Sequence, residues 1–215
     1  MMKDIAIFGA GGFGRELACL LNRINEKSPS WRLVGFFDDG VETGTKISHH
    51  GEVLGGMDKL NDWPSPLAIA IAIGDPMALK SVRERIVNPN LFFPNIIHPD
   101  FLIADEQSFT IGQGNIIQGG CSASCDVTIG DFNVFNGSIC MGHDDKIGNY
   151  NVLMPSIIVS GEVTIGEGNL IGVGSIILQQ IKIGNNVRLG AGAVLMTKPK
   201  DGNTYIGNPA KKFNY

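Results

Sequence analysis

An apolar residue recurs at every sixth position through the second half of the chain. The series starts at residue 111 and continues for fifteen positions without an insertion. Its members are Ile111, Ile117, Ala123, Ile129, Phe135, Met141, Ile147, Leu153, Val159, Ile165, Ile171, Ile177, Ile183, Leu189 and Leu195. The dipeptide Ile-Gly returns at every eighteenth residue, so three hexapeptides make one larger period. Such self-similarity is typical of solenoid folds, in which identical structural units stack on one another.

Three hexapeptides per period predict a three-sided coil in which each side is a short strand. One aliphatic side chain per side points to the axis, and successive coils pair as parallel strands about 4.8 Å apart. The slot four residues later also faces inward, and one such slot holds Asn115, Asn133, Asn151 and Asn169. These residues predict an internal asparagine ladder. Ile97, Ile103 and Phe109 also step by six before the phase shifts by two, so we expect the first coil to start there.

The repeat resembles that of the hexapeptide-repeat acyltransferases. This resemblance implies a left-handed parallel β-helix, whereas the spacing by itself predicts only a coil with three sides.

The part of the chain before the repeat alternates between predicted strands and helices, which indicates a small parallel sheet. Strands are expected at residues 5–9, 32–39 and 67–74, and helices around residues 17–24 and 76–87. We therefore predict an α/β half-Rossmann unit at residues 1–95, followed by the β-helix at residues 96–215.

A GxGxxG motif made of Gly9, Gly11 and Gly14 lies between the first predicted strand and the first helix. Such glycines let a phosphate approach the backbone amides at the start of a helix. Asp38 and Asp39 end the next strand, where an acidic residue binds a hydroxyl or a base edge. A complete NAD site is not expected, because the unit supplies only one mononucleotide half. The alternative is a tight turn between strand and helix that binds nothing.

Taken whole, the chain resembles the sialic-acid O-acetyltransferase-type sugar acyltransferases, which include N-acetyltransferases of nucleotide-linked 4-amino sugars. The residues behind the resemblance are the glycine motif, the hexapeptide repeat and the terminal sequence IGNPAKK at residues 206–212. It implies that a nucleotide sugar is bound by Gly9, Gly11, Gly12, Phe13, Gly14, Asp38, Asp39 and Gly74.

The sequence GHDD interrupts the repeat with a histidine and two carboxylates. His143 and Asp144 follow the inward-facing Met141 by two and three residues, which predicts that they lie at a corner of the coil. Histidine suits a general base near neutral pH, and a neighbouring carboxylate fixes its tautomer. The resemblance implies that His143 is the base and Asp144 its helper; the alternative is a solvated corner histidine. Gly161 lies one coil later, where its N–H is placed to hold the thioester oxygen.

Small residues further along are expected to stack at successive corners and to form a groove for the pantetheine arm of coenzyme A. They are Gly172, Gly174, Gly190, Ala191 and Gly192, and Gly161 would contribute to the same site. Lys211 and Lys212 are candidates for the coenzyme A phosphates. The alternatives are ordinary tight corners and a solvated basic tail. No metal is expected, because the β-helix carbonic anhydrases need three histidines and the repeat supplies only His143.

Three positions depart from the expected pattern. Phe13 and Val152 stand where amino-sugar members of the family often carry histidine, which leaves the acceptor open. Asp145 falls in an inward slot whose neighbours one coil away are Val127 and Val163. A carboxyl group buried there would have a raised pKa unless it is paired.

The net charge of −4 and the pI near 5.5 argue against nucleic acid or an anionic membrane as the main partner. The four cysteines form no CxxC pair, and the chain has no apolar run that could span a membrane, which favours a reducing, cytoplasmic compartment. The resemblance implies a homotrimer with active sites between subunits and a role in surface polysaccharide biosynthesis.

The expected function is acetyl-CoA-dependent N-acetylation of a nucleotide-activated amino sugar. The alternatives are O-acetylation of sialic acid or another sugar, and a non-catalytic scaffold that binds nucleotide sugars.

Overall fold

A computed structural model describes residues 2–213 and divides the chain into two compact units that meet between Pro99 and Asp100. In the part of the chain that it covers, no helix combines the length and apolar character that a membrane crossing requires.

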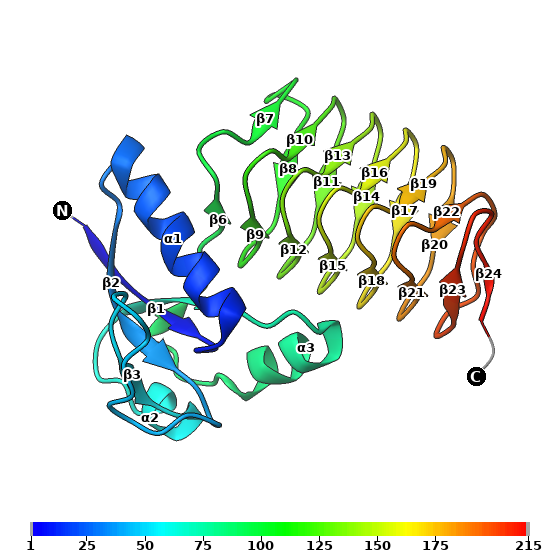
Figure 1. The fold of residues 1–215 in the computed structure, drawn as a ribbon. Helices are drawn as coiled ribbons and strands as arrows, with labels where there is room; N and C mark the ends of the chain where they lie inside the picture. Colours follow the sequence, from blue (N-terminus) through cyan, green and yellow to red (C-terminus); the bar gives the residue numbers. More distant parts are fainter. Residues whose placement is uncertain (1, 214–215) are drawn as a thin grey trace. The chain divides into compact units, whose positions relative to one another are not determined.

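The first unit contains a five-stranded parallel sheet in the order β3-β2-β1-β4-β5 (Figure 1). The strands are β1 (Lys3–Phe8), β2 (Trp31–Phe37), β3 (Val53–Gly55), β4 (Leu67–Ile71) and β5 (Leu91–Phe92). The helices are α1 (Gly12–Lys27), α2 (Met57–Asn61) and α3 (Pro76–Arg85). The three predicted strands and two predicted helices are confirmed. The elements β3, α2 and β5 were not predicted, because elements this short show no period of their own.

The turn between β1 and α1 is fixed by two glycines. Gly9 has a φ of 111°, a conformation that L side chains rarely adopt. At Gly14, a Cβ atom would run into the carbonyl oxygen of Gly9, so the helix approaches the strand closely there. The turn ends at Gly11, which is the N-cap of α1. The first turn of this helix contains no acidic residue.

The second unit is a three-sided parallel β-helix whose strands pair in register from coil to coil (Figure 1). Its three sheets have the orders β22-β19-β16-β13-β10-β7, β20-β17-β14-β11-β8 and β24-β23-β21-β18-β15-β12-β9-β6. The edge strand β6 precedes the boundary at Pro99 and is counted with the first unit, although it pairs in the third of these sheets. The strands are β6 (Ile96–Ile97), β7 (Leu102–Ile103), β8 (Thr110–Ile111), β9 (Ile116–Ile117), β10 (Ser122–Ala123), β11 (Thr128–Ile129), β12 (Val134–Phe135), β13 (Cys140–Met141), β14 (Lys146–Ile147), β15 (Val152–Leu153), β16 (Ile158–Val159), β17 (Thr164–Ile165), β18 (Leu170–Ile171), β19 (Ile176–Ile177), β20 (Lys182–Ile183), β21 (Arg188–Leu189), β22 (Val194–Leu195), β23 (Thr204–Ile206) and β24 (Lys211–Lys212).

The register confirms the eighteen-residue period and the phase shift. Ile129 lies beside Ile147, and Ile147 lies beside Ile165, one full period away in each case. Ile103, however, lies beside Ala123, because the two extra residues fall between β7 and β8.

The corners of the coil are made by residues with positive φ at every sixth position from 114 to 192. Glycine fills some of these corners, but polar and aromatic residues fill the others with φ values between 54° and 63°. These non-glycine corners are Asp126, Phe132, Ser138, Asp144, Tyr150, Ser156, Glu162, Gln180 and Asn186. The left-handed conformation is costly for a single L residue, so it is maintained here by the pairing of neighbouring coils.

The predicted asparagine ladder is confirmed. Asn115, Asn133, Asn151 and Asn169 are fully buried, and each Oδ1 accepts the backbone N–H of the residue eighteen positions later at 2.8 to 3.0 Å. The ladder satisfies amides and carbonyls inside the coil that no water could reach.

Candidate active site

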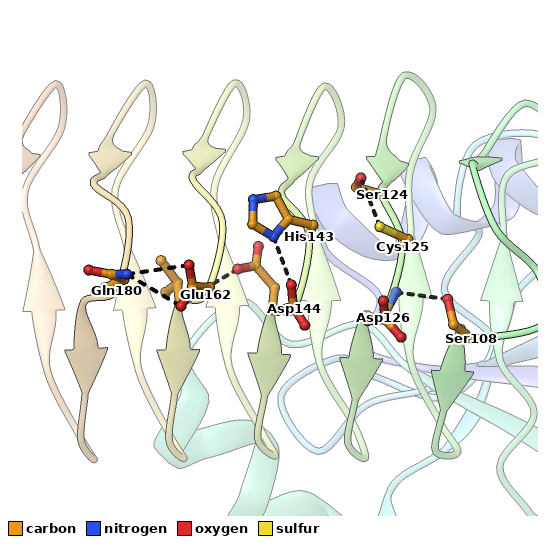
Figure 2. A network of polar contacts seen from close by, with 10 residues as sticks. Ser108, Ser124, Cys125, Asp126, His143, Asp144, Glu162 and Gln180 are labelled. Carbon is orange, nitrogen blue, oxygen red and sulfur yellow. Dashed lines mark hydrogen bonds and ion pairs between the residues drawn. The ribbon is translucent and has the colours of Figure 1, made fainter.

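His143 and Asp144 lie together at one corner of the β-helix, between β13 and β14 (Figure 2). The Nδ1 atom of His143 is 2.7 Å from Oδ2 of Asp144, and both side chains are slightly more than half exposed. Asp144 is one of the positive-φ corner residues, with a φ of 60°. The corner geometry therefore projects both groups out of the coil, as the sequence predicted.

Backbone hydrogen bonds to the neighbouring coils hold this corner on both sides. The N–H of Asp144 donates to the carbonyl of Cys125 at 3.0 Å, and the N–H of Glu162 donates to the carbonyl of His143 at 2.8 Å. The side chains of His143 and Asp144 are exposed, but hydrogen bonds to the preceding and following coils fix their backbone.

The carboxylate of Asp144 raises the pKa of His143 above its usual value of 6.5, mainly through the hydrogen bond between them. The negative charges of Glu162 and Asp145 act in the same direction. Because an ionised carboxylate only accepts hydrogen bonds, Nδ1 carries the hydrogen. The second ring nitrogen, Nε2, is then the basic atom.

Gly161 lies against the imidazole ring of His143. A Cβ atom at Gly161 would be 2.5 Å from Nε2 and 2.7 Å from Cε1 of His143. The φ of Gly161 is not positive, so the backbone does not require glycine. Glycine is needed here because the histidine ring occupies the space of its side chain.

An open hollow of about 300 Å³ lies beside the pair, lined by Asp144, Lys146, Glu162 and Thr164. Lys146, Glu162 and Thr164 were not among the predicted site residues. The signal was present in the period, because Glu162 follows Asp144 by eighteen residues and Thr164 follows Lys146 by the same interval. The lining of the hollow is therefore polar and contains two acidic side chains and one basic side chain.

Asp145 is fully buried next to the exposed pair. Burial raises its pKa from 3.8 to about 6, whereas the hydrogen bond from the amide of Val163, the nearby amide of Gly142 and the charge of His143 oppose the rise. The expectation of a raised pKa is confirmed. Its Oδ1 accepts the N–H of Val163 at 2.9 Å, and Oδ2 has no hydrogen-bond partner among residues 2–213.

The small residues expected to hold coenzyme A lie on paired strands and corners near the end of the β-helix. Gly172 and Gly190 directly follow β18 and β21, which pair with each other, and each would have a clashing Cβ atom. Gly174 and Gly192 are positive-φ corners that face open space. Each of these four glycines therefore has a structural reason that does not involve a ligand, either a close contact or a positive φ.

Ala191 lies between the last two of these glycines, and Lys211 is an exposed residue of β24.

The two aspartates of the first unit have different partners. Asp38 accepts the N–H of Ala10 and the N–H of Gly40, both at 2.8 Å, so it braces the glycine turn. Asp39 accepts the N–H of Met57 at 2.7 Å at the start of α2, and it pairs with Arg85 at 2.8 Å.

The remaining residues predicted to bind the nucleotide sugar are distributed around the same end of the sheet. Gly11 and Gly12 are exposed at the start of α1, Phe13 is half-buried and Gly74 lies beyond the end of β4.

Val152 is fully buried in β15. In the described part of the chain, no three His, Cys, Asp or Glu side chains group in a way that could hold a metal ion.

Two family models match the chain. Residues 4–88 match the PglD N-terminal domain, and residues 162–196 match the bacterial transferase hexapeptide repeats.

Among curated proteins, the UDP-N-acetylbacillosamine N-acetyltransferase of Bacillus subtilis (strain 168) is 31% identical over 118 residues, which are 54% of this chain. The match spans 51% of that protein, so it covers about half the length of the relative.

Solved structures match over the whole chain. The acetyltransferase domain of PglB from Neisseria gonorrhoeae FA1090, in complex with acetyl coenzyme A, has a TM-score of 0.87 at 28% identity. The match covers 99% of this chain and 100% of that domain. PerB from Caulobacter crescentus, in complex with CoA and GDP-perosamine, has a TM-score of 0.83 at 23% identity, with 100% of this chain and 99% of PerB covered. At 23% identity, the similarity to PerB is evidence for the fold of this chain and not for its activity. The chain therefore combines a PglD N-terminal domain with bacterial transferase hexapeptide repeats in a left-handed β-helix, and it is similar over its whole length to the acetyltransferase domain of PglB.

Proposed function

We propose that the protein is an acetyl-CoA-dependent acetyltransferase that acetylates the amino group of a nucleotide-linked sugar. The observation that carries the proposal is the His143–Asp144 pair, which lies against Gly161 at a corner beside a polar hollow. The pair has the geometry of a general base and its orienting carboxylate. The named activities of the Bacillus subtilis and Neisseria gonorrhoeae relatives support the same reaction.

In the proposed reaction, the neutral amine of the sugar attacks the thioester carbonyl of acetyl-CoA. The amine proton passes to Nε2 of His143, and Asp144 stabilises the imidazolium that forms. When the C–S bond breaks, the imidazolium returns the proton to the leaving thiolate. The products are the acetamido sugar and free coenzyme A.

Gly161 is proposed as the oxyanion donor. Its N–H belongs to the peptide that follows Ser160, and a Cβ atom on this residue would meet the ring of His143. A backbone donor at that point would stabilise the negative charge that develops on the thioester oxygen. The glycines at 172, 174, 190 and 192 and Ala191 are proposed to line the pantetheine arm, with Lys211 near the phosphates.

The first unit is proposed to bind the nucleotide part of the acceptor. The exposed start of α1 at Gly11 and Gly12 offers backbone amides and a helix dipole to a diphosphate. Asp38 stabilises this turn by accepting a hydrogen bond from the N–H of Ala10. A free sugar would have no use for such a phosphate site, which favours a nucleotide-linked acceptor.

A homotrimer with interfacial active sites is also proposed. The first residue of each strand in the six-stranded sheet points outward, and this column contains no charged residue. It consists of Leu102, Ser122, Cys140, Ile158, Ile176 and Val194. Leu102 is 65% exposed and Ile158 is 48% exposed, which leaves an apolar face for a second copy. The corresponding column of the five-stranded sheet carries Lys146 and Lys182 instead.

The four cysteines are free thiols in the structure. Free thiols persist in the reducing cytoplasm, which is the compartment that we propose for the enzyme.

The test is release of coenzyme A thiol from acetyl-CoA with three acceptors: a UDP-4-amino-6-deoxy sugar, its GDP counterpart and free sialic acid. We expect turnover with a nucleotide amino sugar. Turnover of sialic acid alone would instead establish an O-acetyltransferase. If no acceptor releases thiol while a nucleotide sugar raises the thermal midpoint, the chain is a non-catalytic binding protein.

A further inference from the structure

Asp145 occupies a slot of the β-helix that otherwise holds either an apolar residue or a buried hydrogen-bond donor. The slot is the residue immediately before each two-residue strand, and Asp145 precedes β14. The other fully buried polar residues in this slot are Asn115, Asn133, Asn151, Asn169 and Ser175. Asp145 is therefore an acid in a position that the fold uses for amides and a hydroxyl.

Each of those polar residues donates a hydrogen bond to the carbonyl oxygen of the residue fifteen positions later. Asn133 donates to Gly148 and Asn151 to Gly166, both at 2.8 Å, and Ser175 donates to Gly190 at 3.0 Å. Asn115 and Asn169 donate to Gly130 and Gly184 in the same way. The asparagines also accept the N–H eighteen positions later through Oδ1, as described above.

Asp145 makes only the accepting half of this pattern. Its Oδ1 accepts the N–H of Val163, eighteen positions later, at 2.9 Å. Its Oδ2 takes the place of the donor and has no partner among the described residues. The carbonyl fifteen positions later belongs to Ser160. An ionised carboxylate cannot donate to it, whereas a protonated carboxyl group has the O–H that the slot requires.

The carbonyl of Ser160 and the N–H of Gly161 belong to one peptide group. The ladder shows what such a peptide does elsewhere in the coil. The Gly130–Asp131 peptide accepts from Asn115 at 2.9 Å on its inner side and donates from Asp131 N–H to Asn149 at 2.8 Å. Hydrogen bonds in series polarise one another, so an inner donor strengthens the outer N–H.

We propose that Asp145 is a positioning residue that acts in its protonated form, donating from Oδ2–H to the carbonyl of Ser160 and so strengthening Gly161 N–H as the oxyanion donor. This inference rests on the proposed acetyl transfer. Deprotonation of Asp145 would remove the inner donor and place a negative charge near the developing oxyanion, which weakens the same step twice.

The charges around Asp145 agree with a group that titrates near neutral pH. Burial raises its pKa to about 6, and the neighbouring negative charge of Asp144 acts in the same direction. The amides of Val163 and Gly142 and the positive charge of His143 favour the ionised form. Negative charge on the thioester oxygen favours the protonated form during the reaction.

The test compares the wild type with Asp145→Asn, which donates at every pH, and Asp145→Val, which has the residue of the neighbouring coils at 127 and 163. We expect the thermal midpoint of Asp145→Asn to exceed that of the wild type by an amount that grows as pH rises from 3.8 to about 6 and then levels off, because the carboxyl group is protonated in the folded state and ionised in the unfolded state within this range. An equal pH dependence of the two midpoints would overturn the protonation of Asp145. This readout needs no substrate, so it remains decisive if the proposed activity fails.

The activity measurement addresses the effect on Gly161. We expect kcat of Asp145→Asn relative to the wild type to rise with pH through about 6, with KM for acetyl-CoA unchanged. We expect Asp145→Val to lower kcat by roughly fivefold to tenfold, the effect of one hydrogen bond. A ratio of kcat values that does not change with pH would show a purely structural role and overturn the proposal.

Asn169→Asp is the matched control, because it places the same acid in the same kind of slot in another sheet. It should acquire a pH-dependent midpoint while the pH dependence of kcat stays that of the wild type. A control that altered the kcat profile equally would show that any acid in the ladder has this effect, and would also overturn the assignment to Gly161.

Discussion

At the scale of single residues, the proposed role of His143 as a base depends on two neighbours, one charged and one without a side chain. Asp144 contributes a charge 2.7 Å from Nδ1, and Gly161 contributes an empty space under the ring. Neither neighbour belongs to the core, because the corner projects outward. Changes at these positions should therefore alter catalysis far more than folding.

His143→Ala should lower kcat by about 10² to 10⁴, the usual effect of losing a general base. The fold and acetyl-CoA binding should persist, because the side chain is 56% exposed. Thiol release and calorimetric binding of acetyl-CoA provide the two measurements. Asp126→Asn, at the corresponding corner one coil earlier, is the control and should leave kcat unchanged. A variant within about threefold of the wild type would exclude His143 as the base.

The pH dependence of kcat/KM should reveal the influence of Asp144. Because Asp144 raises the pKa of His143, the imidazole becomes a free base only above its usual 6.5, and activity should fall below that pH. Asp144→Asn should move the acid limb to lower pH and reduce the maximum rate. The profile of the wild type, measured with the same acceptor, is the reference. An acid limb at the same pH in both proteins would argue against the pairing.

Gly161→Ala should reduce kcat with little loss of stability. The new methyl group would meet the His143 ring at 2.5 to 2.8 Å, while the φ of residue 161 suits alanine. The exposed ring can swing away, so the damage falls on its position. Thermal midpoint and kcat are measured on the same preparation. A large drop in the midpoint together with unchanged kcat would contradict this interpretation.

At the scale of elements, strands of two residues cannot be stable alone, and the β-helix depends on what crosses from coil to coil. Aliphatic side chains fill the axis, and the asparagine ladder satisfies the polar groups beside them. The ladder therefore supplies, at one corner of each of four coils, hydrogen bonds that the short strands cannot make themselves.

Asn151→Val should destabilise the β-helix by roughly 2 to 5 kcal/mol, because it leaves several buried groups without partners. The N–H of Asn169 and the carbonyl of Gly166 both lose a hydrogen bond to Asn151. Valine itself fits the slot, as Val163 and Val187 show. Urea unfolding at constant protein concentration measures the change, with Val163→Ala as a packing control. Wild-type stability would show that the ladder bonds contribute nothing.

At the scale of the whole molecule, the uncharged column of the six-stranded sheet is the proposed contact between copies. Ile158→Asp places a charge in the middle of this column and should convert the trimer to monomers. Lys182→Glu on the five-stranded sheet is the control and should remain trimeric. Light scattering at micromolar concentration gives the mass of each. A wild-type monomer, or a trimeric Ile158→Asp variant, would remove this face from the assembly.

Most of the β-helix could be predicted from the sequence, because in a solenoid the period gives the neighbours of each residue. Residues eighteen apart must stack, so the approach of His143 to Gly161 and the ladder from Asn115 to Asn169 were readable from spacing alone. The raised pKa of Asp145 followed from the same arithmetic, since its slot faces inward.

The pairing of individual polar groups, in contrast, could not be predicted from the sequence. The sequence placed Asp38 and Asp39 together at the end of a strand, but Asp38 braces the glycine turn while Asp39 starts α2 and binds Arg85. Short elements such as β3 and α2 carry no period, and their positions depend on contacts far along the chain. Spacing fixes the backbone neighbours of a repeat, whereas the direction of a side chain depends on every group that surrounds it in space.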